Sequence, residues 1–250
     1  MTDLNPDTID EKIFILVGGL GTRLRSVVSD VPKPMAPVEG KPFLWYKLQQ
    51  LKSVGFRNFV FCAGYLSEII EDYFHDGKVF GVKIEYSHED KRLGTAGAMW
   101  NARDLVDGPF FMCNGDTYLN FNPHPMLNFI EKKDAKYVML LTEPHEKGQE
   151  GVVSVDEDDR IKSFVEKPDD ENLLNQNYIN AGIYYLHPDV IDLIPADQKV
   201  SIEREIFPKM LEKNTPFYGY EYEGYFIDIG IPKNYDRFCD DVKSGKISFD

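Results

Sequence analysis

The sequence predicts an α/β protein in which a doubly wound, mostly parallel sheet carries a smaller antiparallel lobe. Through residue 142, apolar runs of strand length alternate with helical segments, and a glycine-rich turn follows the first run directly. This alternation is typical of parallel strands joined by right-handed crossovers, with a ligand crevice at the carboxyl ends of the strands. Beyond Glu143, short alternating strands flank an acidic turn, which is typical of antiparallel pairing. The larger part is therefore expected to be Rossmann-like.

Strands and helices of the larger part are expected to alternate. Residues 1–11 hold four acids and a proline and predict a loose arm. Pro42 opens the first helix and Gly55 ends it, because proline suits the first helical turn and glycine the position after the last. The expected strands are 12–17, 58–63, 82–86, 109–113 and 135–142, and the expected helices are 42–55, 66–74, 95–103 and 125–132.

The lobe is expected to begin with a hairpin and to end with helices. Residues 151–155 and 160–165 form the hairpin around the acidic turn 156–159, and a long mixed strand returns at 178–186. The remaining elements are a strand pair at 217–222 and 226–227, with helices at 188–193, 202–213 and 232–242.

Composition excludes several classes of partner. The 250 residues are 42% hydrophobic, enough for a sizeable core, and the net charge is −14. Nucleic acids and anionic membranes require a basic footprint, so neither is expected as a partner. The N-terminus lacks an apolar signal region and no stretch approaches a membrane span, which predicts a cytoplasmic protein. Cys62, Cys113 and Cys239 lie far apart and are expected to be reduced.

A phosphate loop is predicted at the end of the first strand. Glycines let main-chain N–H groups approach an anion closely, and Thr22 adds a hydroxyl donor. The glycines are Gly18, Gly19 and Gly21, and the cations that follow them are Arg23, Arg25 and Lys33. The Gly-x4-Gly-Lys-Ser/Thr loop is absent, and Leu24 stands where a dinucleotide fingerprint needs its third glycine. The loop therefore suits a polyphosphate, and a tight turn with solvated cations is the structural alternative.

Two carboxylates are expected at the carboxyl ends of strands. Asp116 follows an apolar strand in a glycine-containing turn, and Asp228 follows a short aromatic strand. Together they would suit Mg²⁺, which prefers one or two carboxylates plus phosphate oxygens and water. Either residue alone could instead serve a turn or a helix cap. Neither the histidine spacing nor any Gly-x-Ser-x-Gly or Cys/His pattern indicates a covalent nucleophile, which favours direct displacement.

A second polar group follows the predicted hairpin. Glu166 can accept two sugar hydroxyls and Lys167 can pair with a phosphate, although an exposed ion pair would look the same in sequence. Asn180 lies in a strand otherwise rich in isoleucine and tyrosine, where its amide needs a partner. A sugar hydroxyl and a core hydrogen bond are both open for it.

These motifs resemble those of the sugar-1-phosphate nucleotidyltransferases. The opening match is Leu-x-Gly-Gly-x-Gly-Thr-Arg-Leu-Arg at 16–25, Pro-Lys-Pro-Met at 32–35 and Gly-Lys-Pro at 40–42. Later matches are Leu-Gly-Thr-Ala-Gly at 93–97, Asn-Gly-Asp-Thr at 114–117, Glu-Lys-Pro at 166–168, Asn-Ala-Gly-Ile-Tyr at 180–184 and Asp-Ile-Gly at 228–230. The resemblance covers residues 13–238. It implies a domain over 12–250, with a nucleotide-binding part at 12–142, a sugar-binding lobe at 143–230 and a C-terminal helix at 231–243.

The resemblance also implies roles for individual residues. Arg23 and Lys33 are expected to act in catalysis, and Asp116 and Asp228 to bind Mg²⁺ as the cofactor. The expected nucleotide-binding residues are Leu16, Gly18, Gly19, Gly21, Thr22, Glu89, Gly94 and Thr95. The expected sugar-phosphate-binding residues are Gly151, Glu166, Lys167 and Asn180. The expected substrates are a nucleoside triphosphate and a sugar 1-phosphate, handled by a monomer or a homodimer.

Within this family, residues 18–37 are most similar to the D-glycero-α-D-manno-heptose 1-phosphate guanylyltransferases. Mannose-1-phosphate guanylyltransferases and glucose-1-phosphate nucleotidyltransferases are the alternatives, and a non-catalytic nucleotide sensor is a further one. GTP is the favoured nucleotide because the Glu89 carboxylate could accept both N1–H and N2–H₂ of guanine. Glu89 could equally belong to a solvated charged loop.

Overall fold

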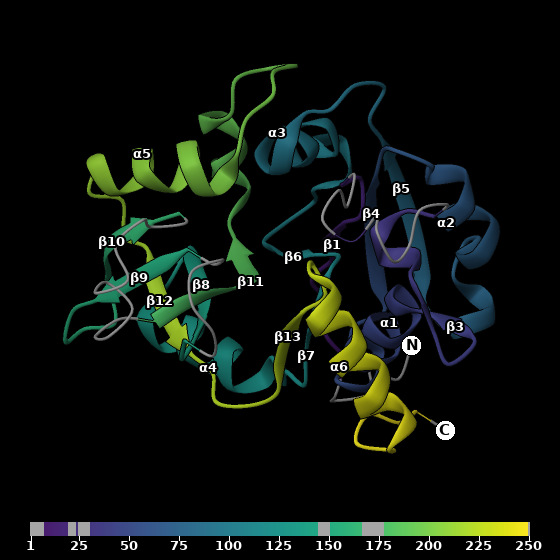
Figure 1. Ribbon diagram of the computed structural model, residues 1–250. Helices are drawn as coiled ribbons and strands as arrows, with labels where there is room; N and C mark the ends of the chain where they lie inside the picture. The colour runs from purple at the N-terminus through teal and green to yellow at the C-terminus, as the bar shows by residue number, and fades with distance from the viewer. Residues whose placement is uncertain (1–7, 20–23, 25–30, 145–150, 167–177, 250) are drawn as a thin grey trace, which may run out of the picture. The chain divides into compact units, whose positions relative to one another are not determined.

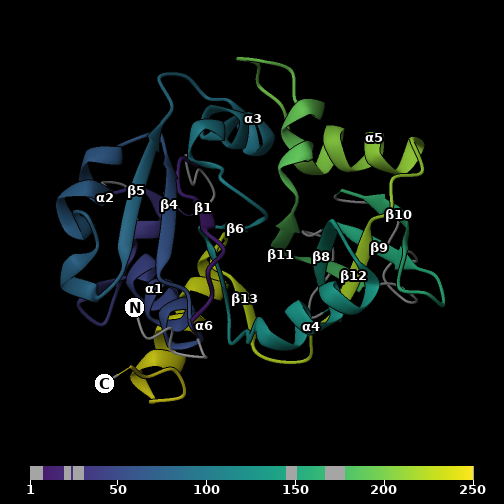
Figure 2. The same ribbon diagram turned by 180° about the vertical axis from the view of Figure 1, so that it is seen from behind.

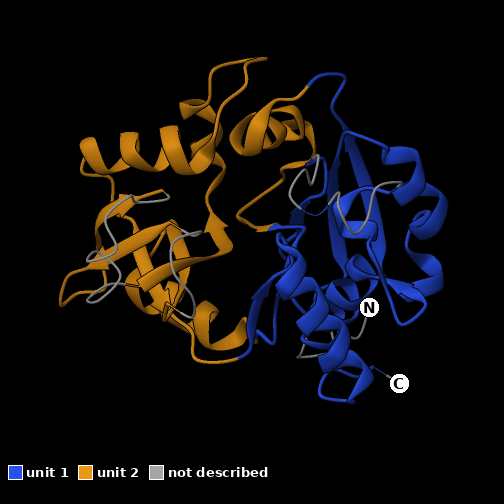
Figure 3. Cartoon of the chain, in the orientation of Figure 1, with its two compact units in different colours: residues 1–91, 114–121, 225–250 blue, residues 92–113, 122–224 orange. Residues whose placement is uncertain are grey.

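A computed structural model gives the structure of the chain and describes residues 8–19, 24, 31–144, 151–166 and 178–249. The chain folds into two compact units, shown in Figure 3. Unit 1 comprises residues 1–91, 114–121 and 225–250, and unit 2 comprises residues 92–113 and 122–224. Each unit is therefore assembled from segments that are separated in sequence.

Unit 1 is built on three parallel strands. They are β1 (Ile13–Leu16), β4 (Asn58–Ala63) and β5 (Lys83–His88), with β4 in the middle. Every residue of β4 after Asn58 is buried. A continuous apolar run is what a parallel strand covered on both faces requires, and this is the pattern that predicted the strand.

Two helices are the crossovers between these strands. They are α1 (Phe43–Ser53) and α2 (Ser67–Phe74). Helix α2 lies beside β5 in Figures 1 and 2, and the Phe74 ring packs edge-on against Phe61 of β4 at a centroid distance of 5.5 Å. The α/β class with parallel strands and helical crossovers is confirmed in this unit.

A small antiparallel pair completes unit 1. Strand β7 (Thr117–Leu119) pairs with β13 (Phe226–Asp228), and helix α6 (Pro232–Lys243) follows. The Phe238 ring of α6 packs between Phe43 and Tyr118, at centroid distances of 4.8 and 5.2 Å. A short ladder of β2 (Pro37–Val38) with β3 (Lys41–Pro42) adjoins α1. The C-terminal helix thus anchors β7 and β13 to α1 by packing aromatic rings.

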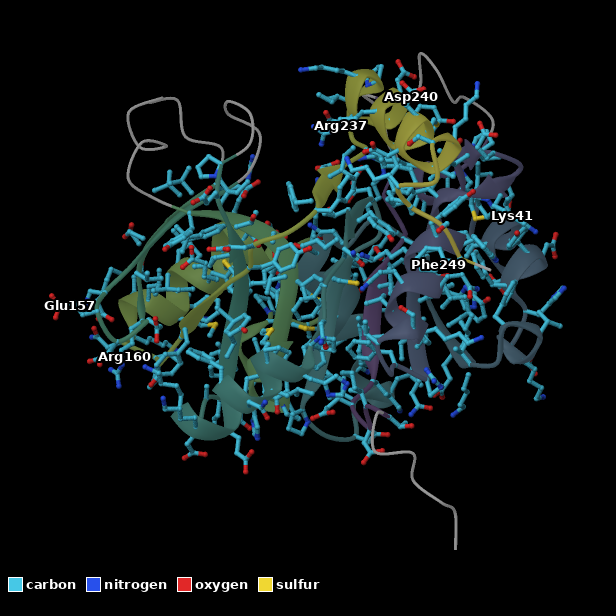
Figure 4. The ribbon with its side chains drawn as sticks, turned by 90° about the horizontal axis from the view of Figure 1, so that it is seen from below. Lys41, Glu157, Arg160, Arg237, Asp240 and Phe249 are labelled. Atoms are coloured by element: carbon cyan, nitrogen blue, oxygen red, sulfur yellow. The ribbon has the colours of Figure 1, made fainter. Side chains whose placement is uncertain are left out.

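Strand β11 (Tyr178–Leu186) is the centre of unit 2. It runs antiparallel to β6 (Phe110–Asn114), β8 (Tyr137–Thr142) and β9 (Val152–Val155). The hairpin partner of β9 is β10 (Ile161–Val165), and β12 (Tyr218–Glu221) lies parallel to β8. Figure 4 shows the exposed side chains of Glu157 and Arg160 at the β9–β10 turn. Antiparallel pairing is therefore confirmed in this unit, which also contains β8 and most of β6 from the part that was expected to carry the parallel sheet.

The helices of unit 2 are short. They are α3 (Gly94–Asn101), α4 (His124–Lys133) and α5 (Phe207–Glu212). A π-helical turn at Ile202–Ile206 precedes α5, and the predicted helix at 188–193 is a 3₁₀-helix. Further 3₁₀ turns of the chain are Lys33–Met35, Lys78–Phe80 and Arg103–Leu105.

One predicted pairing is wrong. Residues 217–222 and 226–227 were expected to pair with each other, but β12 pairs with β8, and β13 pairs with β7. The reason is that the intervening Glu223 and Gly224 resemble a hairpin turn, whereas each strand finds its partner far away in sequence. Strand β7 itself was not predicted because it is only three residues long.

The structure contains neither a disulfide nor a membrane-spanning helix among the described residues. All three cysteines are without disulfides, with Cys62 and Cys113 buried and Cys239 half-buried. Among the helices that the structure describes, none combines the length and the apolar character needed to cross a membrane.

Candidate active site

The end of β1 leads into the predicted phosphate loop. The Val17 amide donates to the Cys62 carbonyl at 3.0 Å, and the Leu16 carbonyl accepts from the Gly115 amide at 3.0 Å. A Cβ on Gly18 would lie 3.1 Å from the Gly64 nitrogen, so glycine allows two loops to approach closely here. Gly19 is exposed, and no atom of the described residues lies within 4 Å of a Cβ built on it.

Several predicted loop residues lie outside the described part of the chain. They are Gly21, Thr22, Arg23 and Arg25. Their expected roles in binding phosphate and in catalysis stay predictions.

Glu89 lies beside this loop. It directly follows β5, and its amide donates to the Ala63 carbonyl at 2.9 Å. A Cβ on Gly18 would lie 3.2 Å from Glu89 Oε1, which puts the carboxylate next to the loop glycine rather than out in solvent. Glu89 is half-buried. The structure therefore brings the predicted base-reading carboxylate to the predicted phosphate loop.

Lys33 joins the two predicted metal ligands. Its ammonium lies 2.6 Å from Asp116 Oδ2 and 3.6 Å from Asp228 Oδ1. The lysine is only 8% exposed. It is presented by the 3₁₀ turn between Pro32 and Ala36, in which the Ala36 amide donates to the Lys33 carbonyl at 3.0 Å. A carboxylate from the turn between β6 and β7 and one from the end of β13 therefore meet at one cation.

The charges in this cluster control ionisation. Burial disfavours the charged form of Asp116, but the adjacent Lys33 ammonium outweighs it and holds the pKa of that carboxyl below its usual range. Lys47 adds a weaker attraction of the same sign. Asp116 is therefore a carboxylate at neutral pH, as a metal ligand must be.

Backbone bonds fix the two aspartates relative to each other. Asp228 lies opposite Thr117 in the β13–β7 register, and the Ile229 amide donates to the Asp116 carbonyl at 3.0 Å. The Asn234 side chain donates to the Asp228 carbonyl at 2.8 Å. The carboxylates are thus held by the strand pair itself.

The donor set of this cluster fits a hard divalent cation. Two carboxylates that already converge on an ammonium can converge on a metal ion, and Mg²⁺ commonly takes one or two protein carboxylates with substrate phosphates and water. Among the described residues, no group of three or more histidine, cysteine and acidic side chains could hold a metal. A metal here would need oxygen ligands from substrate or solvent.

Lys47 and Gln50 were missed by sequence reasoning. Both are buried on α1, and they donate to the carbonyls of Thr117, the first residue of β7, and of Phe121, two residues beyond its end. The available signal was that Lys47 lies on the apolar stripe with Leu44 and Leu48, where a lysine is unexpected.

The predicted residues Gly94 and Thr95 lie at the start of α3 in unit 2. Gly94 has a positive φ of 72°, and a Cβ there would lie 2.6 Å from the Val200 carbonyl. The Thr95 hydroxyl donates to Glu203 at 2.7 Å and accepts from the Ile202 amide at 2.8 Å. The Thr95 side chain is therefore engaged with the π-helical turn, and its contact with a nucleotide stays a prediction.

The described sugar-phosphate residues come together in unit 2. A Cβ on Gly151 would lie 2.9 Å from Glu166 Oε2, and the Gly151 carbonyl accepts from the Asn180 amide at 2.8 Å. The Asn180 side chain donates to the Tyr184 hydroxyl at 2.7 Å and accepts from the Gly182 amide at 2.9 Å. These are core bonds, the second alternative for this amide, and sugar binding stays a prediction for it. Lys167 lies outside the described residues.

Tyr184 was not predicted as a site residue. Burial raises the pKa of its hydroxyl well above the usual value, and the nearby carboxylates of Glu203 and Glu166 act in the same direction. The hydroxyl is therefore protonated at all physiological pH values, and the group around Asn180 is a neutral hydrogen-bonding network flanked by two carboxylates.

A glycine-rich loop at the end of a strand and a nearby cluster of Lys33, Asp116 and Asp228, on an α/β sheet, are typical of nucleotide-binding proteins. The sequence model described as nucleotidyl transferase matches residues 12–244. The chain therefore belongs to the nucleotidyl transferase family. Enzymes of this family typically use a divalent metal.

Similar proteins fall into two groups by length. The chain is 36% identical over 228 residues to D-glycero-alpha-D-manno-heptose 1-phosphate guanylyltransferase of Campylobacter jejuni, covering 90% of this chain and 97% of that protein. It is 35% identical over 233 residues to mannose-1-phosphate guanylyltransferase of Mycobacterium tuberculosis, covering 92% of this chain and 64% of that protein. The chain thus spans less than two thirds of the length of this mannose relative.

Solved structures agree with the fold. HddC from Yersinia pseudotuberculosis superposes with a TM-score of 0.79 at 32% identity, covering 93% of this chain and 99% of HddC. HddC complexed with GMP-PN gives a TM-score of 0.78 at 33% identity, with the same coverage. A putative glucose-1-phosphate thymidylyltransferase from Bacillus anthracis has a TM-score of 0.82 at 22% identity, which shows a common fold.

Proposed function

We propose that the chain transfers a guanylyl group from GTP to a sugar 1-phosphate, with D-glycero-α-D-manno-heptose 1-phosphate as the favoured acceptor. The observation that carries the proposal is the convergence of Asp116 and Asp228 on Lys33. The turn that contains Asp116 is hydrogen-bonded to the end of β1. The acceptor is favoured because the Campylobacter relative, of which the chain covers 97%, is named for that activity. We place the reaction in the cytoplasm, in a monomer or a homodimer.

The reaction is a direct displacement. A phosphate oxygen of the sugar 1-phosphate attacks the α-phosphorus of GTP, the bond from that phosphorus to the bridging oxygen breaks, and pyrophosphate leaves with the electron pair. The attacking phosphate is already anionic at neutral pH, so little acid–base chemistry is needed. Catalysis then consists of positioning the reactants and neutralising the charge that develops.

Cations of unit 1 supply that neutralisation. Arg23 holds the β- and γ-phosphates, where negative charge builds on the leaving group, because its forked guanidinium suits phosphate oxygens. The ammonium of Lys33, which pairs with Asp116 and Asp228, contacts the phosphates of both substrates. The N–H groups of Gly18, Gly19 and Gly21 bind the triphosphate.

Asp116 and Asp228 would hold the Mg²⁺ ion. A bound ion would polarise the α-phosphate and offset the charge of the polyphosphate, which would reduce repulsion between this acidic chain and its anionic substrates. The chain contributes two carboxylates that already converge on the Lys33 ammonium.

Residues of unit 2 bind the acceptor. Glu166 accepts hydroxyls of the sugar and Lys167 pairs with its phosphate. The close approach of Gly151 to Glu166, with Asn180 bonded to Gly151, supports a single subsite for these residues. The neutral network of Asn180 and Tyr184 is suited to recognising the hydroxyl groups of a sugar by hydrogen bonds.

Glu89 selects guanine. The base presents two adjacent donors on its Watson–Crick edge, and a carboxylate can accept both, whereas uracil would present carbonyl oxygens to it. The position of Glu89 next to Gly18 supports this role, and Leu16, Gly94 and Thr95 are the other proposed nucleotide contacts.

Mannose 1-phosphate is the second candidate acceptor, because several guanylyltransferases that share 35–38% identity with the chain are named for it. Glucose 1-phosphate is a further candidate. A non-catalytic sensor is disfavoured because such a protein could lose its metal ligands, and both are present here with Lys33 between them.

The test is a screen for release of pyrophosphate. The four common ribonucleoside triphosphates are each combined with mannose, glucose and heptose 1-phosphates in the presence of Mg²⁺. Release that is fastest with GTP and heptose 1-phosphate supports the proposal, and release with mannose 1-phosphate alone supports the second candidate. No release with any pair, from a protein that binds GTP, would favour the sensor.

A further inference from the structure

Lys47 and Gln50 lie about one helical turn apart on α1, and both reach the segment that contains β7. The Lys47 ammonium donates to the Thr117 carbonyl at 2.8 Å, and the Gln50 amide donates to the Phe121 carbonyl at 2.6 Å. The two residues are 2% and 3% exposed. Their bonds therefore bracket β7 from the side of α1.

Packing alone does not account for a lysine at this place. An ammonium removed from water is unfavourable unless it is paired, and lysine is almost never fully buried otherwise. The neighbours of Lys47 on the apolar stripe, Leu44 and Leu48, are fully buried, so an apolar side chain fits this helix face. The charge of Lys47 acts on the Asp116 carboxylate, one residue before the carbonyl that it contacts. The lysine is thus tied to the site by both its bond and its charge.

Strand β7 needs support because it is short. It has three residues, and its strand partner is β13, with the Ile229 amide bonded to the Asp116 carbonyl. We propose that Lys47 and Gln50 are positioning residues that clamp β7 to α1 and thereby fix the direction of the Asp116 carboxylate. The inference rests on the proposed metal-binding role of Asp116.

The experiment compares Lys47→Met and Lys47→Arg with Tyr46→Phe as the matched control. Tyr46 is the adjacent residue of α1, is also buried, and donates to the Val38 carbonyl at 3.1 Å rather than to the β7 segment. Binding of Mn²⁺ is measured without nucleotide by electron paramagnetic resonance, and kcat and both KM values are measured with GTP and the sugar phosphate.

Metal affinity separates the clamp from simple electrostatics. Loss of a positive charge near a cation site would by itself strengthen Mn²⁺ binding. The clamp predicts the opposite, about tenfold or more weaker binding in Lys47→Met with a similar fall in kcat and little change in either KM, because residues that support metal ligands have effects of this size. Lys47→Arg should recover part of the affinity, and Tyr46→Phe should match wild type. Tighter or unchanged Mn²⁺ binding in folded Lys47→Met would overturn the inference.

Hydrogen exchange provides a test that is independent of the proposed function. Amides of residues 114–121 should exchange faster in Lys47→Met than in wild type or Tyr46→Phe. If wild type binds no Mn²⁺, the metal assignment fails and this exchange measurement alone decides on the clamp. If Lys47→Met does not fold, Gln50→Leu should show faster exchange and weaker Mn²⁺ binding to a smaller extent, and wild-type values in that variant would reject the clamp.

Discussion

The polar groups of unit 1 and unit 2 are organised in different ways. In unit 1, the Lys33 ammonium lies within 3.6 Å of a carboxylate oxygen of both Asp116 and Asp228. In unit 2, the amide of Asn180 and the hydroxyl of Tyr184 form a neutral network. Fixed charges act strongly on a transition state in which charge moves, whereas neutral bonds recognise uncharged hydroxyls. We therefore propose that the charged groups of unit 1 perform the chemistry and that the neutral network of unit 2 selects the acceptor.

The largest expected effect comes from removing a charge in unit 1. Asp116→Asn should lower kcat at least about a hundredfold, the scale typical for loss of one strong electrostatic group, while the thermal melt stays close to wild type. Steady-state kinetics with Mg²⁺ and with EDTA measure this. Asp189→Asn, which removes an exposed carboxylate paired with Lys136, is the control and should retain activity. Near-normal turnover of wild type in EDTA would contradict the metal assignment.

We expect unit 1 also to select the base, through Glu89. Wild type should prefer GTP over UTP in kcat/KM by tens to about a hundredfold, because a good bidentate contact contributes about 1 to 3 kcal/mol of discrimination. Glu89→Gln should remove most of this preference, and Glu85→Gln, in the preceding strand β5, should not. A ratio that is unchanged in Glu89→Gln would leave this residue without a role in reading the base.

A substitution in unit 2 should act on the acceptor alone. Gly151→Ala introduces a Cβ within 2.6 Å of the Phe164 ring and 2.9 Å of Glu166 Oε2, and such overpacking costs about 1 to 3 kcal/mol. The KM for the sugar 1-phosphate should rise about tenfold while the KM for GTP stays unchanged. Gly108→Ala is the control because nothing lies within 4 Å of its added Cβ. A rise in the KM for GTP would contradict the assignment of the Gly151 subsite to the acceptor.

The smallest effect is expected from Tyr184→Phe. The change leaves the buried Asn180 amide without its hydroxyl acceptor, which should reduce the free energy of unfolding by about 1 to 3 kcal/mol. Denaturant unfolding measures this loss. The kcat at saturating substrates should stay within about twofold of wild type, since no charge is removed. A fall in kcat comparable to that of Asp116→Asn would place chemistry in unit 2.

Strong local patterns made much of the fold predictable. The strands at 58–63 and 178–186 match to the residue because apolar and aromatic runs of that length have few other solutions. Strand β7 was missed because three residues carry no periodicity. The predicted partners of β12 and β13 were wrong because sequence patterns favour pairing between strands that are close in sequence. In units assembled from distant segments, closeness in sequence does not decide which strands pair.

The site residues could be predicted where they belong to short sequence motifs. The glycine loop with Pro-Lys-Pro-Met and the two strand-end aspartates located Lys33, Asp116 and Asp228, which the structure brings together. Lys47 could not be found in this way, since a lysine on a helix is usually solvated and only its place on the apolar stripe is unusual. Thr95 shows the converse, because its hydroxyl contacts Glu203, which no motif indicated.

We propose that the chain transfers a nucleotidyl group to a sugar phosphate rather than hydrolysing the nucleotide. Phosphorus-31 NMR of a reaction with GTP, heptose 1-phosphate and Mg²⁺ tests it most directly. We expect equimolar formation of a GDP-sugar and pyrophosphate, and neither product when the sugar phosphate is omitted. Formation of GDP and orthophosphate, or release of pyrophosphate without an acceptor, would contradict it.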